Sequence, residues 1–252
     1  MTNDENKGIQ MTQQSDHIKS FYGELLQTRL LSFVNATSGF VHNICNPLTI
    51  IATRAQLLQM KMPQNTDFEK MVEQSKIIES MLNNIVYISR NILDKEFKLL
   101  NINDLLKNEV SFFLTDSFFK HNVGKNYQLQ SNLPKTKGVY FHISTVFFCV
   151  MQLQLFLMRE AVEKKITIRT SEKDNRIIVD ISGTGERMSK KEINQICSKS
   201  INPETDDIKP KQLLINNLAK SCQMTPGSDI RLAIENNPDR TDYQMMIPII
   251  HE

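Results

Sequence analysis

Apolar side chains between residues 34 and 58 recur at steps of three, four and seven residues, and this spacing limits the possible folds more than any other feature of the sequence. Such positions form one stripe along a helix of 3.6 residues per turn. The pattern repeats over residues 67–93, after the break "KMPQNTDFEK", where Pro63 ends one helix and Thr66 or Asp67 is expected to cap the next. We expect helices over about 16–61 and 67–93, with apolar stripes made of Val34, Val41, Ile44, Leu48, Ile51, Ala55 and Leu58 in the first and Phe68, Met71, Ser75, Ile78, Leu82, Ile85 and Ile92 in the second.

Two long helices joined by a short turn form an antiparallel hairpin, which leaves one apolar side uncovered. Pairing with a second copy into a four-helix bundle covers that side. We therefore expect a homodimer that forms through residues 16–97. Residues 1–15 are polar and rich in amides, and we expect them to be a disordered tail.

Residues 98–252 have a different pattern, in which short strands alternate with helices. Segments near 126–133 and 137–142 are typical of strands, and 143–160 of a buried helix. The pairs "KKITIRT"/"NRIIVDIS" around "SEKD" and "DIRLAIENN"/"DYQMMIPII" around "PDRT" predict two β-hairpins, and helices are expected at about 189–198 and 210–223. The predicted fold class is α+β, a helical hairpin followed by an α/β sandwich.

Composition excludes several classes of function. A net charge of +2 lacks the basic excess of a general nucleic-acid binder. The apolar run 143–158 contains Gln152 and Gln154 and is short for a membrane span, so a buried helix is the better interpretation. The N-terminus is polar and shows no secretory signal. We expect a cytoplasmic protein with reduced cysteines and no metal, because its four cysteines are far apart and form no CxxC pair: Cys45, Cys149, Cys197 and Cys222.

A histidine stands out on the first helix, within "GFVHNICNPLTII". His42 and Asn46 are four residues apart, so they share one side of the helix, and the apolar stripe places that side outward. Asn43 and Thr49 lie beside them. Pro47, in mid-helix, costs roughly 3 kcal/mol. An exposed histidine is ordinary on its own, and the proline could merely let the helix curve, but their combination marks a candidate site.

The stretch "FVHNICNPLTIIATRAQLL" resembles the phosphoacceptor box of two-component sensor histidine kinases, whose pattern is H-[E/D]-x-x-[N/T]-P-L. His42, Asn46, Pro47 and Leu48 match it, and "LNINDLLKNEV" resembles the segment that leads into the ATP-binding domain of those kinases. The resemblance implies that His42 is phosphorylated on an imidazole nitrogen and that Asn46 positions water for dephosphorylation of a response regulator. Asn43 replaces the usual acidic residue, and an amide cannot act as the base that withdraws the histidine proton.

The same resemblance implies an ATP site of the gyrase type, with a magnesium-binding asparagine on a helix and a glycine-rich lid. The matching helix here reads "QLQLFL" from Gln152, and Phe156 takes the place of the asparagine, although Mg²⁺ requires oxygen ligands. None of the eight glycines lies between residues 186 and 226, where the lid is expected. Lys209 and Lys211 could contact phosphate there, but such lysines are more often solvated.

The adenine-binding motif D-x-G-x-G of the family is only partly present in "DISGTG". Gly183 and Gly185 remain, while Ile181 replaces the aspartate. Asp180 is one residue away, and in a strand that shift sends a side chain to the opposite face. The second domain is thus expected to be a degenerate kinase-type domain that binds no nucleotide.

From these residues we expect a histidine phosphotransferase that relays a phosphoryl group between response-regulator receiver domains through His42. No cofactor is expected, because the receiver supplies the aspartate and Mg²⁺. Ser38 and Gly39 are small and Thr49 lies beside the site, so these three residues are the candidates for receiver docking. Three alternatives remain: a receiver phosphatase that uses Asn46, a pseudokinase that only binds partners, and a divergent active kinase.

Overall fold

The computed structural model describes residues 3–198, 209–223, 230–238 and 240–250, with side chains from residue 28 onward. The chain divides into two compact units, Met1–Arg90 and Asn91–Glu252. This division lies before the boundary that the sequence predicts after residue 97. Each unit is described by itself.

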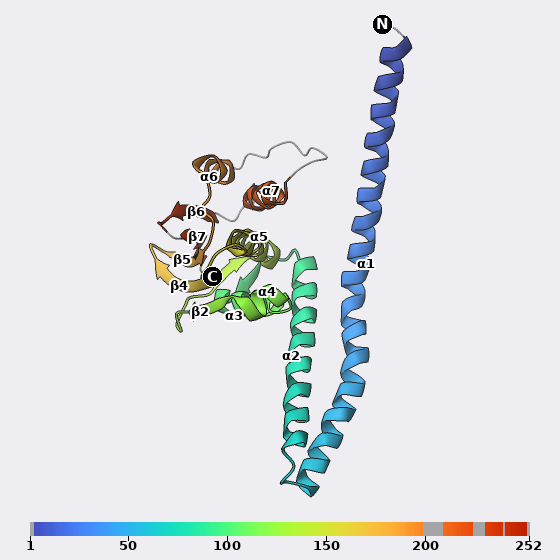
Figure 1. Ribbon diagram of the computed structural model, residues 1–252, viewed down its shortest axis with the longest axis vertical. Helices are drawn as coiled ribbons and strands as arrows, with labels where there is room; N and C mark the ends of the chain where they lie inside the picture. Colours follow the sequence, from blue (N-terminus) through green and yellow to red (C-terminus); the bar gives the residue numbers. More distant parts are fainter. Residues whose placement is uncertain (1–2, 199–208, 224–229, 239, 251–252) are drawn as a thin grey trace. The chain divides into compact units, whose positions relative to one another are not determined.

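The first unit consists of helix α1 (Asn3–Lys61) and most of helix α2 (Thr66–Leu93) (Figure 1). The predicted end of the first helix is confirmed. Its predicted start near residue 16 is wrong, because the helix already begins at Asn3 and covers most of the segment expected to be a disordered tail. The reason lies in the residues themselves: 3–15 contain no proline, and Glu, Lys, Gln and Met are good helix formers.

Helix α2 begins at Thr66, but its cap is not the predicted one. The Asn65 side chain accepts a hydrogen bond from the backbone N–H of Asp67 at 3.0 Å. Asn65 therefore fills the capping role expected of Thr66 or Asp67. Asparagine is among the best N-capping residues, because its short side chain reaches the free N–H groups of the first turn.

The predicted apolar stripe is only partly buried within the hairpin. Val41, Ala55 and Val72 are buried, and the predicted stripe residue Ser75 is buried as well. Other predicted stripe positions are exposed along one flank, together with large apolar neighbours: Phe33 (71%), Phe40 (63%), Ile51 (50%), Leu58 (39%), Met71 (45%), Ile78 (43%) and Ile92 (38%). The hairpin thus covers one part of its apolar surface and leaves another part open.

The second unit is an α/β sandwich, which confirms the predicted α+β class. Its five-stranded sheet has the order β2-β4-β5-β7-β6, with β2 and β4 parallel and the other neighbours antiparallel. A separate two-stranded sheet pairs β1 with β3. The elements are β1 (Lys98–Leu100), α3 (Ile102–Phe113), α4 (Ser117–Asn122), β2 (Gly124–Gln128), β3 (Thr136–Gly138), α5 (Tyr140–Met158), β4 (Lys165–Lys173), β5 (Arg176–Thr184), α6 (Lys190–Cys197), α7 (Pro210–Gln223), β6 (Arg231–Asn236) and β7 (Arg240–Pro248).

The turn between β4 and β5 lies further along the chain than predicted. The strands continue through the expected turn "SEKD" as far as the facing pair Lys173 and Arg176. The two connecting residues, Asp174 and Asn175, have φ values of 51° and 55°. Positive φ at both positions is the backbone of a type I′ turn, whose twist matches that of the strands and which asparagine and aspartate tolerate.

Helix α5 is the centre of the core, with Val146, Phe147, Val150 and Leu153 fully buried. It is long and apolar enough to cross a membrane, but 56% of its most apolar window is buried inside the domain. The predicted buried helix is therefore confirmed, with bounds of 140–158 instead of 143–160.

Candidate functional site

The exposed face of α1 carries the histidine. Helix α1 continues through Pro47, and His42, Asn43 and Asn46 are all exposed. Within the part of the chain whose side chains are described, these three form no side-chain hydrogen bond or ion pair. The imidazole and the two amides are therefore open to a molecule that approaches from solvent.

The three predicted docking residues differ in their surroundings. An added Cβ at Gly39 would meet nothing within 4 Å, so this turn of α1 is open. The Thr49 hydroxyl donates a hydrogen bond to the backbone carbonyl of Cys45 at 2.8 Å, as is common for threonine in helices. The Ser38 hydroxyl accepts a hydrogen bond from Nη2 of Arg90, on α2, at 2.9 Å.

Arg90 was not a candidate from the sequence, although a signal for it exists. In an antiparallel hairpin, residues equally distant from the turn face each other. Ser38 and Arg90 each lie about 25 residues from the turn at residues 62–65. This symmetry, applied to the residue one helical turn before His42, points to the region of Arg90.

In the second unit, the two glycines of "DISGTG" lie tightly against helix α5. Gly185 has a φ of +134°, and an added Cβ would lie 2.5 Å from the carbonyl oxygen of Leu157. An added Cβ at Gly183 would lie 2.3 Å from the side-chain nitrogen of Gln154, which donates a hydrogen bond to the Thr184 carbonyl at 2.9 Å. Gly185 is therefore required for close packing of the strand end on the helix, whereas a side chain at Gly183 would have to displace the Gln154 amide.

The side chain of Gln154, on α5, thus fills the space between this helix and the glycine motif. The sequence did not single out Gln154 for this role. It is fully buried. The two predicted positions on either side of it differ: Gln152 is exposed, and Phe156 is half-buried against the core. Residues two apart in a helix point about 200° away from each other around the helix axis. Only one of the two glutamines can therefore point inward.

Ile181 is fully buried on the helix-covered face of the sheet. The neighbouring Asp180 lies on the other face, where its carboxylate accepts a hydrogen bond from the Gln244 side chain at 2.9 Å. This is the alternation expected of a regular strand. The only acidic side chain in "DISGTG" therefore points away from the helices.

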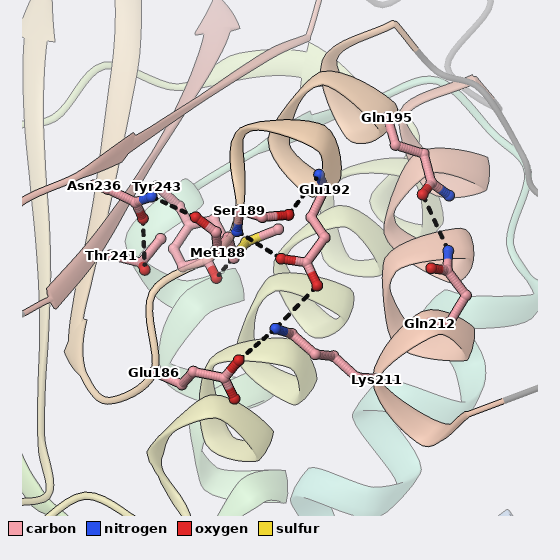
Figure 2. Close-up of polar contacts among 10 residues, drawn as sticks. All are labelled: Glu186, Met188, Ser189, Glu192, Gln195, Lys211, Gln212, Asn236, Thr241 and Tyr243. Carbon is pink, nitrogen blue, oxygen red and sulfur yellow. Dashed lines mark hydrogen bonds and ion pairs between the residues drawn. The ribbon is translucent and has the colours of Figure 1, made fainter.

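An ion-pair cluster joins the loop after β5 to helices α6 and α7 (Figure 2). Lys211 Nζ lies 2.7 Å from Glu186 Oε1 and 2.9 Å from Glu192 Oε1. Glu192 also accepts a hydrogen bond from the Ser189 backbone N–H at 2.6 Å, which completes a capping box at the start of α6. Lys211 is therefore neither free nor simply solvated, contrary to the more frequent expectation for such a lysine, whereas Lys209 is exposed.

The pKa values of this cluster follow from its contacts. Burial raises the pKa of Glu192, but hydrogen bonds from Ser189 and Lys211 outweigh it and hold the pKa below its ordinary value. Burial lowers the pKa of Lys211, but the two carboxylates outweigh it and raise the pKa. Both groups are thus held in their charged forms.

Four further hydrogen bonds hold the same region together, and Figure 2 shows those between Gln212 and Gln195 and between Asn236 and Met188. Gln195 of α6 donates a hydrogen bond to Asn216 of α7 at 2.8 Å, and Gln212 donates to both at 3.0 and 3.1 Å. Asn236 donates to the Met188 carbonyl at 2.6 Å. These contacts hold α6 against α7 and the loop before α6 against β6.

The cluster borders an open hollow of about 640 Å³. Two carboxylates line it, together with Arg187 and Lys211, so its formal charges balance. Among the described residues, no group of three or more His, Cys, Asp or Glu side chains could hold a metal ion. The complete lining is Glu186, Arg187, Met188, Ser189, Glu192, Lys211 and Asn236.

Comparison with solved structures gives the class of fold. A nucleotide-free form of the catalytic domain of histidine kinase ThkA matches with a TM-score of 0.50 at 16% identity, over 61% of this chain and 97% of that domain. At this identity the likeness shows the fold alone: the sandwich has the fold of a histidine kinase catalytic domain. ThkA in complex with the response regulator TrrA matches over 89% of this chain and 64% of that one (TM-score 0.47, 17% identity), and a bacterial phosphotransferase over 84% and 95% (TM-score 0.44, 7% identity). No protein-family model and no curated protein matches the sequence.

Proposed function

We propose that this protein is a histidine phosphotransferase of a two-component phosphorelay, which passes a phosphoryl group between response-regulator receiver domains through His42. The observation that carries the proposal is the open position of the imidazole. His42 is exposed on a long helix, and its neighbours one turn away on α1 include the small residues Ser38 and Gly39 and the amide Asn46. A receiver domain can therefore bring its phosphoaspartate into line with the ring.

The chemistry requires little from this chain beyond position. The imidazole nitrogen attacks phosphorus, a P–N bond forms, the P–O bond to the receiver aspartate breaks, and the carboxylate leaves. Charge on the transferring group is balanced by the Mg²⁺ of the receiver. Transfer to a second receiver is the reverse of the same step. Holding an unhindered ring in line with the acyl phosphate is thus the main contribution of the hairpin.

The ion-pair cluster of the second unit supports a relay without ATP. Nucleotide phosphates are recognised by free cations and open backbone N–H groups. Lys211 is instead held by Glu186 and Glu192, which would repel a triphosphate. The packing of Gln154 on Gly183 adds a second obstacle, because it fills the space beside the glycine motif. In this proposal the sandwich is a scaffold or docking surface.

The exposed apolar flank of the hairpin supports a homodimer. Phe33, Phe40, Ile51 and Leu58 are separated by 7, 11 and 7 residues, each close to a whole number of helical turns, so they lie on one side of α1. Soluble monomers rarely expose a continuous apolar surface of this kind. A second copy that covers it completes the four-helix bundle.

The proposal is tested with receiver domains of the same organism, each phosphorylated with radiolabelled acetyl phosphate. We expect an acid-labile label to pass to the wild-type protein and not to His42→Gln. Absence of label on the wild type, with every receiver tried, would overturn the proposal. In a parallel reaction, labelled ATP with Mg²⁺ is expected to leave the protein unlabelled, and stable labelling of His42 would identify a kinase instead.

A receiver phosphatase is the second candidate, and the exposure of Asn46 favours it. Its amide lies one turn after His42 and forms no side-chain hydrogen bond within the described part of the chain, so it can orient a water molecule. His42→Gln separates the two functions. Relay requires the imidazole, whereas dephosphorylation by water needs only the amide.

A further inference from the structure

Arg90 carries a positive charge that no described residue neutralises. It is exposed, and its side chain donates a hydrogen bond to the Ser38 hydroxyl. Among the described residues it forms no ion pair with a carboxylate. A guanidinium has five N–H donors, so several remain free for a further acceptor.

The hydrogen bond places this charge beside the candidate phosphoacceptor. Ser38 and His42 are four residues apart on α1, where side chains are neighbours with Cβ atoms about 6 Å apart. Helical side chains lean toward the N-terminus, so the imidazole of His42 lies over the turn that contains Ser38. The guanidinium on Ser38 is therefore next to the space above the ring.

We propose that Arg90 is a phosphoryl-binding residue, which contacts the oxygens of the phosphoryl group while it is transferred to and from His42. The proposal rests on the phosphotransferase function inferred above. During transfer the three phosphoryl oxygens carry the charge, and a planar guanidinium donates two parallel hydrogen bonds to such oxygens. Asn43 is an uncharged amide and cannot provide this charge, and the Mg²⁺ would belong to the receiver domain and not to this chain. Ser38 serves to hold the guanidinium in place.

The first experiment needs no receiver. Phosphoramidate phosphorylates histidine side chains with release of ammonia, and the ³¹P signal of phosphorylated His42 is identified by its absence in His42→Gln. We expect the pH midpoint of its phosphoryl titration to rise by roughly half a pH unit in Arg90→Ala, because a nearby cation favours the dianion. Arg54→Ala is the matched control: it removes an exposed arginine of the same hairpin about 18 Å along α1. Equal midpoints in Arg90→Ala and the wild type would overturn the proposal.

The second experiment measures transfer from a phosphorylated receiver at saturating concentration. Arg90→Ala is expected to slow transfer about 10- to 100-fold, the usual effect of losing a charged hydrogen bond to a reacting group. Arg90→Lys retains the charge and should recover part of the rate, while Arg54→Ala should match the wild type. A lower melting temperature with unchanged transfer in Arg90→Ala would show a purely structural role and overturn the proposal.

These experiments distinguish failure of the phosphotransferase function from failure of the proposed role of Arg90. Transfer to the wild type but not to His42→Gln, with Arg90→Ala as fast as the wild type, leaves the phosphotransferase function standing and removes Arg90 from it. Absence of transfer to the wild type removes the phosphotransferase function. The phosphoramidate titration then still decides whether Arg90 binds a phosphoryl group on His42.

Discussion

Lys211 Nζ lies 2.9 Å from Glu192 Oε1 and so joins the first turn of α7 to the first turn of α6. Lys211→Met removes this ion pair and the one to Glu186. Because the lysine side chain is 21% exposed and the ion pairs are partly solvated, we expect a loss of about 1 kcal/mol, or a fall of about 3 °C in the melting temperature of the domain. Calorimetry measures it, and Lys209→Met, on an exposed lysine of the same segment, should change little.

The same variant gives a pH dependence with a defined sign. The pKa of Glu192 is lowered from 4.5, so its contribution to stability is present above pH 4.5 and is lost as the pH falls through the lowered value. The pKa of Lys211 is raised from 10.5, so its contribution is full below pH 10.5 and is lost as the pH rises through the raised value. The gap between wild type and Lys211→Met should therefore be widest between these limits. A gap that does not change with pH would contradict the ion-pair account.

Gly185→Ala should destabilise the second unit by roughly 2–4 kcal/mol, because the added methyl group needs a positive φ and meets the Leu157 carbonyl. Thermal unfolding measures the loss. Gly39→Ala is the matched comparison, since the same change on an open helical face should stabilise α1 by about 1 kcal/mol. Similar changes in stability for Gly185→Ala and Gly39→Ala would show that a side chain at residue 185 causes no backbone strain.

Pro47→Ala should stabilise the first unit by as much as about 3 kcal/mol, because it restores a backbone donor for the Asn43 carbonyl. Slower hydrogen exchange of the amides that follow residue 43 is the expected observation. Pro63→Ala, in the turn between the helices, provides the control and should leave that exchange unchanged. Faster exchange in Pro47→Ala would mean that the proline fits its surroundings better than alanine.

Phe40→Glu should convert the proposed homodimer into a monomer, because it places a charge on the exposed apolar flank of α1. Analytical ultracentrifugation at several protein concentrations measures the change. Leu57→Glu makes the same substitution about 100° away around the helix and should leave the mass unaltered. A wild-type protein that sediments as a monomer at all concentrations would reject the dimer.

Asn46→Ala should accept label from a phosphorylated receiver like the wild type but lose any acceleration of receiver dephosphorylation. The amide is exposed and distant from the hairpin core, so folding should be unaffected. The half-life of the receiver phosphate, measured with Asn46→Ala and with His42→Gln, separates water-mediated loss from relay. An unchanged half-life in Asn46→Ala relative to the wild type excludes the amide as a water-positioning group.

Local patterns in the sequence determined much of the architecture. The three- and four-residue spacing predicted both long helices, Pro63 predicted the end of α1 at Lys61, and alternation predicted the strands of both hairpins. Such patterns are reliable because the period of a helix or strand decides which side chains share a face. The helix start at Asn3, the Asn65 cap and the Asp174–Asn175 turn escaped prediction, since they depend on small differences among local conformations.

Tertiary structure alone decided which polar residues meet. His42, Asn43 and Asn46 were candidates because they are close in sequence, and helix geometry then suffices to bring them together. Arg90 and Ser38, or Lys211, Glu186 and Glu192, come from separate elements. Their contacts depend on how helices and strands pack, which is set by the summed burial of many apolar side chains and not by the residues that form the contact.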